Sequence, residues 1–252
     1  ESQNKVIPGA YINILTNTPL SITAGDRGTV VLAQELSVGT DNEIYEITVN
    51  NAAYPDNATA ADKKLAGLAL LGAKTVLLYK LPASHTDEHV EAMMTALKTV
   101  DFDVLVYPYA KSGTGSSTAQ QTIATWIKSI QDDEGKNVTV VLPNYTADSE
   151  YVINSVQGVT LSDGSNLTAY ETAAWIGGIT AGASVTKSNT GQKFVGAIDV
   201  SPRMTRSEQE TAIKAGKFLL DVDRSQNVTV VADKERYFKT EPLRPDCMWY
   251  SQ

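Results

Sequence analysis

The chain has 252 residues, 42% of them hydrophobic and 20% charged, so it is long enough to bury a substantial core. Acidic residues outnumber basic ones 29 to 21, and the formal charge of −8 argues against nucleic-acid binding because such a surface repels phosphate backbones. Its longest apolar stretches run to about ten residues, too short to cross a bilayer, so we expect no membrane association as a monomer. The opening residues show no secretory signal.

Residues 1–20 are predicted to form an extended N-terminal arm. The stretch is β-prone, but Pro8-Gly9 interrupts it, and proline is tolerated in edge strands and not in central ones. Fully extended, such a stretch reaches roughly 50 Å at about 3.3 Å per residue. It can therefore add to the sheet edge of another subunit, and the residues expected at that interface are Val6, Ile7, Pro8, Gly9, Tyr11, Ile12 and Ile14.

Residues 21–233 are predicted to form an α/β core. Thr29 to Ala33 is a short apolar run suited to burial on both faces, and a second strand is expected at 43–49. Helical patterns then alternate with apolar strands, with helices at 61–72, 86–99 and 117–131 and strands at 75–79, 102–107 and 138–142. This alternation predicts a mostly parallel sheet flanked by helices on both faces.

The helix at 61–72 is expected to place Leu65, Leu68 and Leu71 on one face and to end at Gly72. The second helix is expected to begin at a cap formed by Thr86 or Asp87, and its inward residues are Val90, Met93, Met94 and Leu97. The helix at 117–131 carries Ile123, Trp126, Ile127 and Ile130.

The second half of the core continues with a strand-like segment at 151–159. A helix at 168–183 is rich in small residues, which let another backbone approach closely, so we expect it to be buried between layers. Thr205 and Glu208 form a capping box, which predicts a helix reaching Leu220. A last strand is expected at 228–232, followed by an irregular C-terminal tail at 234–252.

No motif in the sequence indicates catalysis, a cofactor or a metal site. The two histidines, His85 and His89, are four residues apart but lack the glutamate of the metalloprotease pattern, and a solvated helix start is the favoured interpretation. Residues 111–117 resemble a phosphate-binding loop in position and match neither the Walker nor the dinucleotide pattern. Cys247 is the single cysteine, which excludes a disulfide within the chain, and it lies in the irregular tail.

Two further functions remain open at this level. A flavodoxin-like small-ligand or enzymatic domain would bind its ligand at the carboxyl ends of the strands, near Lys111 to Ser117. A secreted adhesin or surface-layer component would use some of the five Asn-x-Ser/Thr triplets, such as those at Asn137 and Asn227, for glycosylation. Trp126 and Trp175 lie at core-like helical positions, which favours packing over ligand stacking.

A set of short segments, in this order and spacing, resembles the tail sheath proteins of contractile phages. The similarity is greatest to sheaths of defective prophages and phage-tail-like bacteriocins, and it spans residues 4 to about 233. The segments are Asn4 to Asn13, Asp26-Arg27-Gly28, Glu35-Leu36, Leu65-Ala66-Gly67, Leu77 to Leu81, Trp175 to Gly178, Ala181-Gly182, Asn189-Thr190, Thr205 to Glu210 and Ala212 to Phe218.

This resemblance implies a structural and non-catalytic role. Such proteins polymerise helically around a tail tube and contract to drive it through a bacterial envelope, with extended terminal arms adding strands to neighbouring subunits. The implied partners are copies of the chain itself, the tail tube protein, and the baseplate and tail terminator proteins. The implied location is a virion tail or a phage-tail-like particle, assembled in the host cytoplasm.

The sequence departs from that family in two places. Members often carry a β-rich insertion after the strand that here ends at Leu81, and they continue past residues 228–232 into a large C-terminal domain. Here residue 81 leads almost directly into a helix, and only residues 233–252 follow the last predicted strand. We therefore expect a minimal sheath protein, a truncated product, or a chain from which disordered segments are missing.

Overall fold

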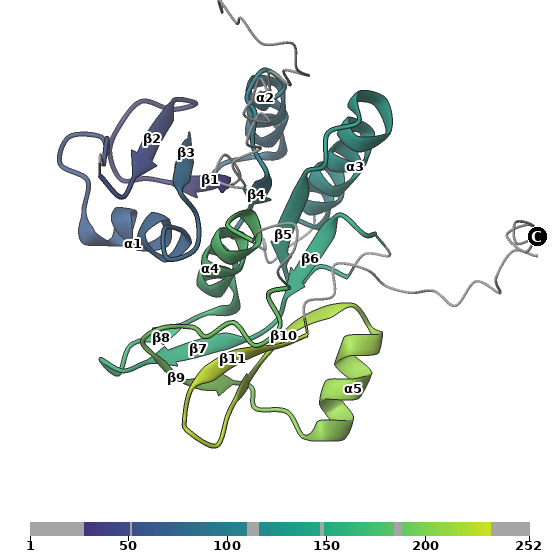
Figure 1. The fold of residues 1–252 in the computed structure, drawn as a ribbon. Coiled ribbons are helices and arrows are strands. Elements are labelled where there is room, and N and C mark those ends of the chain that lie inside the picture. The colour runs from purple at the N-terminus through teal and green to yellow at the C-terminus, as the bar shows by residue number, and fades with distance from the viewer. Residues whose placement is uncertain (1–27, 51, 110–115, 147–148, 184–187, 233–252) are drawn as a thin grey trace, which may run out of the picture.

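A computed structural model describes residues 28–50, 52–109, 116–146, 149–183 and 188–232 and shows an α/β fold (Figure 1). The predicted arm at 1–20 and the predicted tail at 234–252 lie outside the described residues, as does most of the loop at 111–117. The predicted core is therefore the part of the chain that can be compared with the structure.

An eight-stranded sheet forms the centre of the molecule, in the order β11-β10-β6-β5-β4-β1-β3-β2. Its six inner strands run parallel, which confirms the prediction of a mostly parallel sheet. These strands are β1 (Thr29–Glu35), β3 (Thr75–Leu81), β4 (Val104–Val106), β5 (Thr139–Pro143), β6 (Val152–Ser155) and β10 (Lys217–Val222). The two edge strands, β2 (Ile44–Thr48) and β11 (Val228–Ala232), are antiparallel to their neighbours.

Helices cover both faces of this sheet. Residues of α1 (Ala60–Ala69) and α4 (Ala169–Ala181) pack with Val30 and Leu32 of β1. Residues of α2 (Asp87–Leu97) and α3 (Ser116–Glu134) pack on the opposite face with Val31 and Ala33. Successive residues of a strand point to opposite faces, so a strand buried on both sides is apolar at successive positions, as β1 is from Val30 to Ala33.

A second, three-stranded antiparallel sheet joins the first below α4 (Figure 1). It consists of β7 (Gly158–Leu161) between β8 (Asn166–Leu167) and β9 (Ala197–Ser201). The fifth helix, α5 (Arg206–Lys214), contacts β10 and buries only Ala212 completely. The predicted strand at 151–159 is thus two strands, β6 and β7, which belong to different sheets.

Helix α4 is buried, as its small residues predict. Gly178 and Gly182 lie directly against the backbone carbonyls of Ala69 and Gly72, leaving no space for a Cβ atom. On α4, Trp175 is 1% exposed and stacks on Phe194 with ring centroids 4.2 Å apart. Glycine is required here because the α1 and α4 backbones touch.

Two helix predictions need correction. Leu71 does not share a buried face with Leu65 and Leu68, because α1 ends at Ala69 and Leu71 is 57% exposed. The buried residues of α1 are Asp62, Ala66 and Ala69, and Leu65 and Leu68 pack partly buried against the same core.

The helix beginning after Thr205 was predicted to reach Leu220 but ends at Lys214. Gly216 has φ +72°, a left-handed conformation that stops a helix, and Lys217 then begins β10. The apolar run Phe218-Leu219-Leu220 fits a buried strand as well as a helix, which is why periodicity alone did not separate them.

Candidate assembly surfaces

The β11 edge of the larger sheet is covered by the chain's own residues 191–194. The amide of Gly191 donates to the carbonyl of Val230 at 2.8 Å, and the amide of Phe194 donates to the carbonyl of Val228 at 2.9 Å. The amide of Val230 donates in turn to the carbonyl of Gln192 at 3.0 Å. An edge whose backbone groups are already paired is protected against strand addition.

The opposite edge, at β2, is covered less completely. Ile47 forms an antiparallel bridge with Ala52, so the chain turns back along its own edge strand. Glu46 points outward and is exposed, and a charge on an edge strand also opposes pairing with another chain. Within the described residues, the β2 edge is therefore less protected than the β11 edge.

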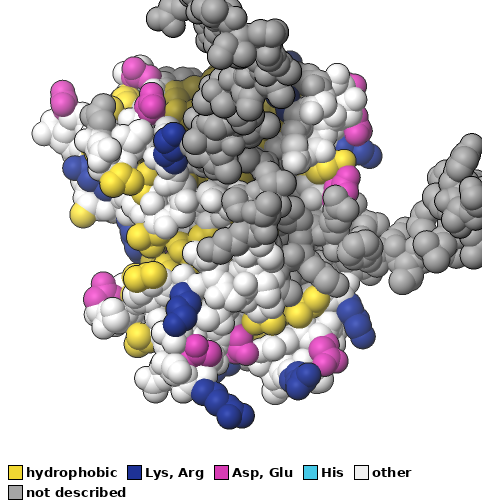
Figure 2. All heavy atoms as spheres, viewed as in Figure 1, with side chains coloured by type: hydrophobic (Ala, Val, Ile, Leu, Met, Phe, Trp, Pro, Cys, Tyr) yellow, Lys and Arg dark blue, Asp and Glu magenta, His cyan; other side chains and the backbone are white. Residues whose placement is uncertain are grey.

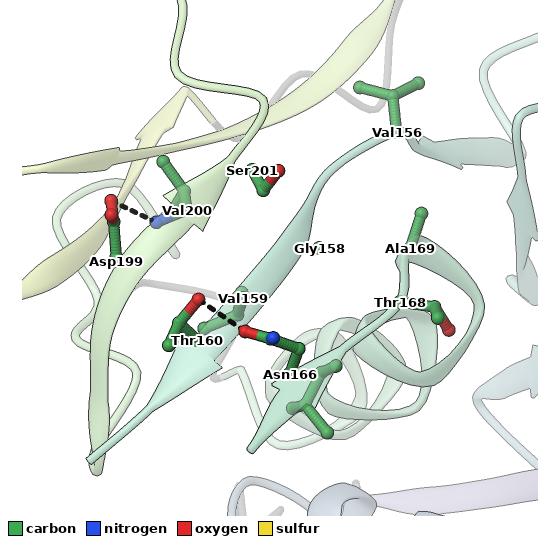
Figure 3. Close-up of a pocket in the computed structure, with 11 residues that line it drawn as sticks. Val156, Gly158, Val159, Thr160, Asn166, Thr168, Ala169, Asp199, Val200 and Ser201 are labelled. Carbon is green, nitrogen blue, oxygen red and sulfur yellow. Dashed lines mark hydrogen bonds between the residues drawn. The ribbon is translucent and has the colours of Figure 1, made fainter. Parts of the chain in front are cut away.

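The three-stranded sheet has a groove on its exposed face, with a volume of about 580 Å³. Figure 3 shows its walls, which come from β7, β8 and β9 and from the start of α4. A hydrogen bond of 2.8 Å joins Thr160 Oγ1 to Asn166 Oδ1 across two of these strands. Asp199 accepts from the Val200 amide and from Arg203, both at 2.7 Å. Polar side chains such as Thr160, Asn166 and Asp199 line the groove together with apolar ones such as Val156 and Val200.

Large apolar side chains are exposed at four described positions. These are Val49, Leu71, Val195 and Ile198, with exposed fractions of 75%, 57%, 78% and 46%. Figure 2 shows apolar side chains in small separate patches between charged ones on the visible face. Ile198 lies in β9 and Val195 two residues before it, so both belong to the region of the three-stranded sheet.

The carboxyl ends of β1 and β4 form a second candidate functional site. The inner strands follow the order β3-β1-β4-β5-β6, so the order reverses between β1 and β4. Ligands of doubly wound α/β folds bind at this kind of reversal, beyond the carboxyl ends of the strands. Glu35 ends β1, and Tyr107 and Tyr109 follow β4, so their side chains stand at this position.

A cluster made of Glu35, His85, Tyr107 and Tyr109 fills this position, with His85 and Tyr107 buried and the Glu35 side chain 33% exposed. His85 is 4% exposed and places Nδ1 2.6 Å from Glu35 Oε1 and Nε2 2.6 Å from Tyr107 Oη. The His85 amide also donates to Glu35 Oε1 at 3.1 Å, and the Glu35 amide donates to Tyr109 Oη at 2.6 Å. The two tyrosine rings make an edge contact with each other, with centroids 5.4 Å apart.

Burial keeps the phenols of this cluster protonated. Desolvation raises the pKa of Tyr109 to about 12, although its hydrogen bond from the Glu35 amide opposes the rise. Desolvation also raises the pKa of Tyr107 strongly, with smaller contributions from Tyr109, Asp87 and Glu35. Both hydroxyls therefore carry their hydrogens at physiological pH, and the cluster packs as an enclosed set of aromatic and polar groups.

The remaining chemistry of the described residues is sparse. No group of three His, Cys, Asp or Glu side chains within the described ranges is placed to hold a metal ion. Among the helices that the structure describes, none is both long enough and apolar enough to cross a membrane.

Residues 83–234 match the family model described as the phage tail sheath protein central domain, which covers more than half of the chain. This chain belongs to the phage tail sheath protein family. It is 28% identical to the uncharacterized protein YqbK of Bacillus subtilis strain 168, over 91% of this chain and 50% of that protein. The chain described in this structure spans at most about half the length of these curated relatives.

Solved structures show the same fold. The sheath tail protein DSY3957 of Desulfitobacterium hafniense matches with a TM-score of 0.77 and 24% identity, over 92% of this chain and 76% of that one. The helical sheath of the anti-feeding prophage in its contracted state matches with a TM-score of 0.62 and 17% identity, over 91% and 68%. The predicted family resemblance and the predicted α/β fold are both confirmed.

The structure tests some of the residues singled out from the sequence and not others. All seven predicted arm residues lie within residues 1–27, outside the described part of the chain, so their role stays a prediction. The interpretation of both histidines as a solvated helix start was wrong for His85, which is buried. His89 fits it better, because its Nδ1 accepts from the Thr86 amide at 3.0 Å and completes the cap of α2.

Sequence patterns gave no signal for the groove or for the buried cluster. Glu35 and Tyr107 are 72 residues apart in the sequence, and only the pairing of β1 with β4 brings them together.

Proposed function

We propose that this chain is a structural subunit of a contractile tail sheath, which polymerises helically around a tail tube and contracts to drive it through a bacterial envelope. The family match over residues 83–234 is the observation on which this rests. The fold likeness to a helical sheath in its contracted state supports it. The proposal assigns no catalytic step to the chain.

The proposed division of the chain is an arm at 1–20, a core at 21–233 and a tail at 234–252. In this division the arm links subunits by adding a strand to a neighbour, through Val6, Ile7, Pro8, Gly9, Tyr11, Ile12 and Ile14. Because the chain's own residues 191–194 cover the β11 edge, the acceptor for this strand is a different edge.

The proposed partners are further copies of the chain, the tail tube protein, and the baseplate and tail terminator proteins. The proposed location is a phage tail or a phage-tail-like particle assembled in bacterial cytoplasm. Contraction would then re-pack rigid subunit faces while the strand links keep the polymer connected.

The filled strand ends favour this role over a flavodoxin-like ligand domain. In such a domain the reversal between β1 and β4 would hold a ligand crevice, whereas here His85, Tyr107 and Tyr109 pack into that position.

Electron microscopy of the purified chain tests the proposal. The full chain is expected to form rods or rings at high concentration, and a variant lacking residues 1–20 is expected to stay monomeric with unchanged helix content by circular dichroism. A matched pair refines this test. Ile12→Asp places a charge on the predicted interface, and Asn13→Asp places the same charge on the alternate face of the arm. A full chain that remains monomeric and turns over a small molecule would contradict the proposal.

A further inference from the structure

Helix α5 is joined to the rest of the protein through a small contact. It packs on β10, and Ala212 is its buried residue. A helix of nine residues is marginal in water without further packing. In Figure 1, α5 lies at the end of the molecule opposite α2, with one side facing away from the body. A short helix with this little support gains stability when another surface covers it.

A groove of about 400 Å³ runs along one side of α5. Ser207, Thr211 and Ala215 are exposed and spaced four residues apart on the helix, so they form one continuous wall of this α5 groove. Pro202 and Met204 contribute apolar atoms next to the wall. Because the wall consists of small side chains, a second helix can approach α5 closely along the groove.

The α5 groove also carries positive charge. Its charged residues are Arg203, Lys217 and Glu208. Glu208 accepts from the Thr205 amide at 2.7 Å and from the Thr205 hydroxyl at 2.8 Å, so its carboxylate is bound to the cap of α5. Arg203 uses Nε to bind Asp199 at 2.7 Å, and its side chain is still 65% exposed. The groove therefore favours a partner with exposed carboxylates.

The charge of the whole chain is divided in the same sense. Residues 188–232, which include α5, carry six basic and five acidic side chains. Residues 28–183 carry eight basic and 18 acidic ones. The rest of the chain is therefore complementary in charge to the end that holds α5, which makes a second copy of this chain a suitable partner.

Helix α2 offers exposed carboxylates on a side that matches the α5 groove. It carries three acidic residues and no lysine or arginine. Glu88, Glu91, Ala92 and Thr95 are exposed and lie at helical spacing, so they share one side of α2. This side combines negative charge with small residues, which close packing of two helices requires.

We propose that the α5 groove binds the exposed side of α2 of a second copy of this chain. The two surfaces differ and lie at opposite ends of the molecule (Figure 1), so the contact is heterologous. Each copy then binds one neighbour through α5 and another through α2, and the contact repeats into an open polymer. This contact rests on the proposed function, since it supplies one of the links of that polymer.

Three exposed threonines in the same local setting allow a matched test. Thr211 of the α5 groove, Thr95 of α2 and Thr125 of α3 each donate a hydroxyl hydrogen bond of 2.9 Å to the carbonyl four residues earlier. Thr211→Glu places an acid against the acids of α2, and Thr95→Arg places a base against the bases of the groove. Thr125→Glu and Thr125→Arg make the same changes on a helix outside both surfaces.

Sedimentation of the full chain measures the concentration at which it assembles, and circular dichroism checks that each variant is folded. Thr211→Glu and Thr95→Arg are each expected to raise the assembly concentration by at least about tenfold, because they bring like charges together. Both Thr125 variants are expected to assemble as the unmodified chain does. Combining Thr211→Glu with Thr95→Arg restores opposite charges across the contact, so the double variant is expected to assemble at a lower concentration than either single variant.

Failure of the contact and failure of the proposed function give different results. An unmodified chain that does not assemble contradicts the proposed function itself. If the unmodified chain assembles and both single variants assemble equally well, the contact between α5 and α2 is refuted and the proposed function stands. A double variant that assembles no better than the single variants would refute the pairing of these two surfaces.

Discussion

Asp62 is a single carboxylate that fixes the start of α1 to the end of β1. It accepts from the Ser37 amide at 3.0 Å and hydroxyl at 2.6 Å, and from the Thr59 amide at 2.9 Å and hydroxyl at 2.7 Å. Its backbone carbonyl accepts from Gln34 Nε2 at 3.1 Å. Desolvation raises the pKa of Asp62, but the four hydrogen bonds outweigh it and hold this pKa well below its usual range.

We predict that Asp62→Asn destabilises the chain by about 1–3 kcal/mol at neutral pH, because an amide cannot accept from all four donors. A folded-state pKa below the unfolded value means that the contribution is complete above about pH 4 and is lost as pH falls further. Urea unfolding at about pH 7 and at about pH 3 measures both effects, with exposed Asp56→Asn as the control. A similar loss of stability at both pH values would contradict this account.

His85 marks the limit of sequence interpretation at the residue scale. Its neighbours in the sequence, Ser84 and Thr86, suggest a solvated helix start, and His89 one turn later partly fulfils that expectation. Burial of His85 depends on Glu35 and Tyr107, which come from strands far away in the sequence. No local pattern contains this information.

At the scale of elements, helices and strands with a strong local pattern were predictable. The cap at Thr86 and the buried positions of α2, Val90, Met93, Met94 and Leu97, agree with the prediction. The strands β8, β9 and β10 were not predictable, because they depend on pairing with strands far away in the sequence. The boundary between α5 and β10 lies at Gly216, whose left-handed conformation ends the helix. A glycine is a helix-stop signal in the sequence, but the apolar run after it continued the helical pattern and hid the boundary.

The contact between α1 and α4 predicts opposite effects on stability for two glycine-to-alanine substitutions. Gly178→Ala is expected to destabilise the fold by about 1–3 kcal/mol, because its Cβ atom would overlap the carbonyl of Ala69. Gly67→Ala, on α1 itself, has no atom within 4 Å of the new Cβ and should stabilise by about 0.5–1 kcal/mol through helix propensity. Chemical denaturation of both variants checks the signs, and a loss for Gly67→Ala as large as that for Gly178→Ala would count against close helix packing.

At the scale of the molecule, the two helical layers share one sheet. The parallel strands between them are buried on both sides, so neither layer can separate without exposing apolar side chains of β1, β3 and β4. A three-layer body of this kind suits the proposed sheath role, in which contraction moves whole subunits past each other. The fold class was predictable from the order of helices and strands, and the family was predictable from the order and spacing of the short segments that resemble sheath proteins.

The two buried layers should therefore unfold together, and the tryptophans allow this to be measured. Trp175 reports on the α4 layer through its stacking on Phe194, and Trp126 reports on the α3 layer through its stacking on Phe102 at 6.4 Å. Replacing Trp249 and one of these two by Phe leaves a single reporter in each of two proteins. We expect each reporter's fluorescence transition in urea to coincide with the loss of helix seen by circular dichroism in the same protein. The contrary result would be a Trp126 transition at lower urea than the loss of helix, while the Trp175 transition still coincides with the loss of helix. It would show that the α2–α3 layer detaches first and that the two layers do not unfold as one unit.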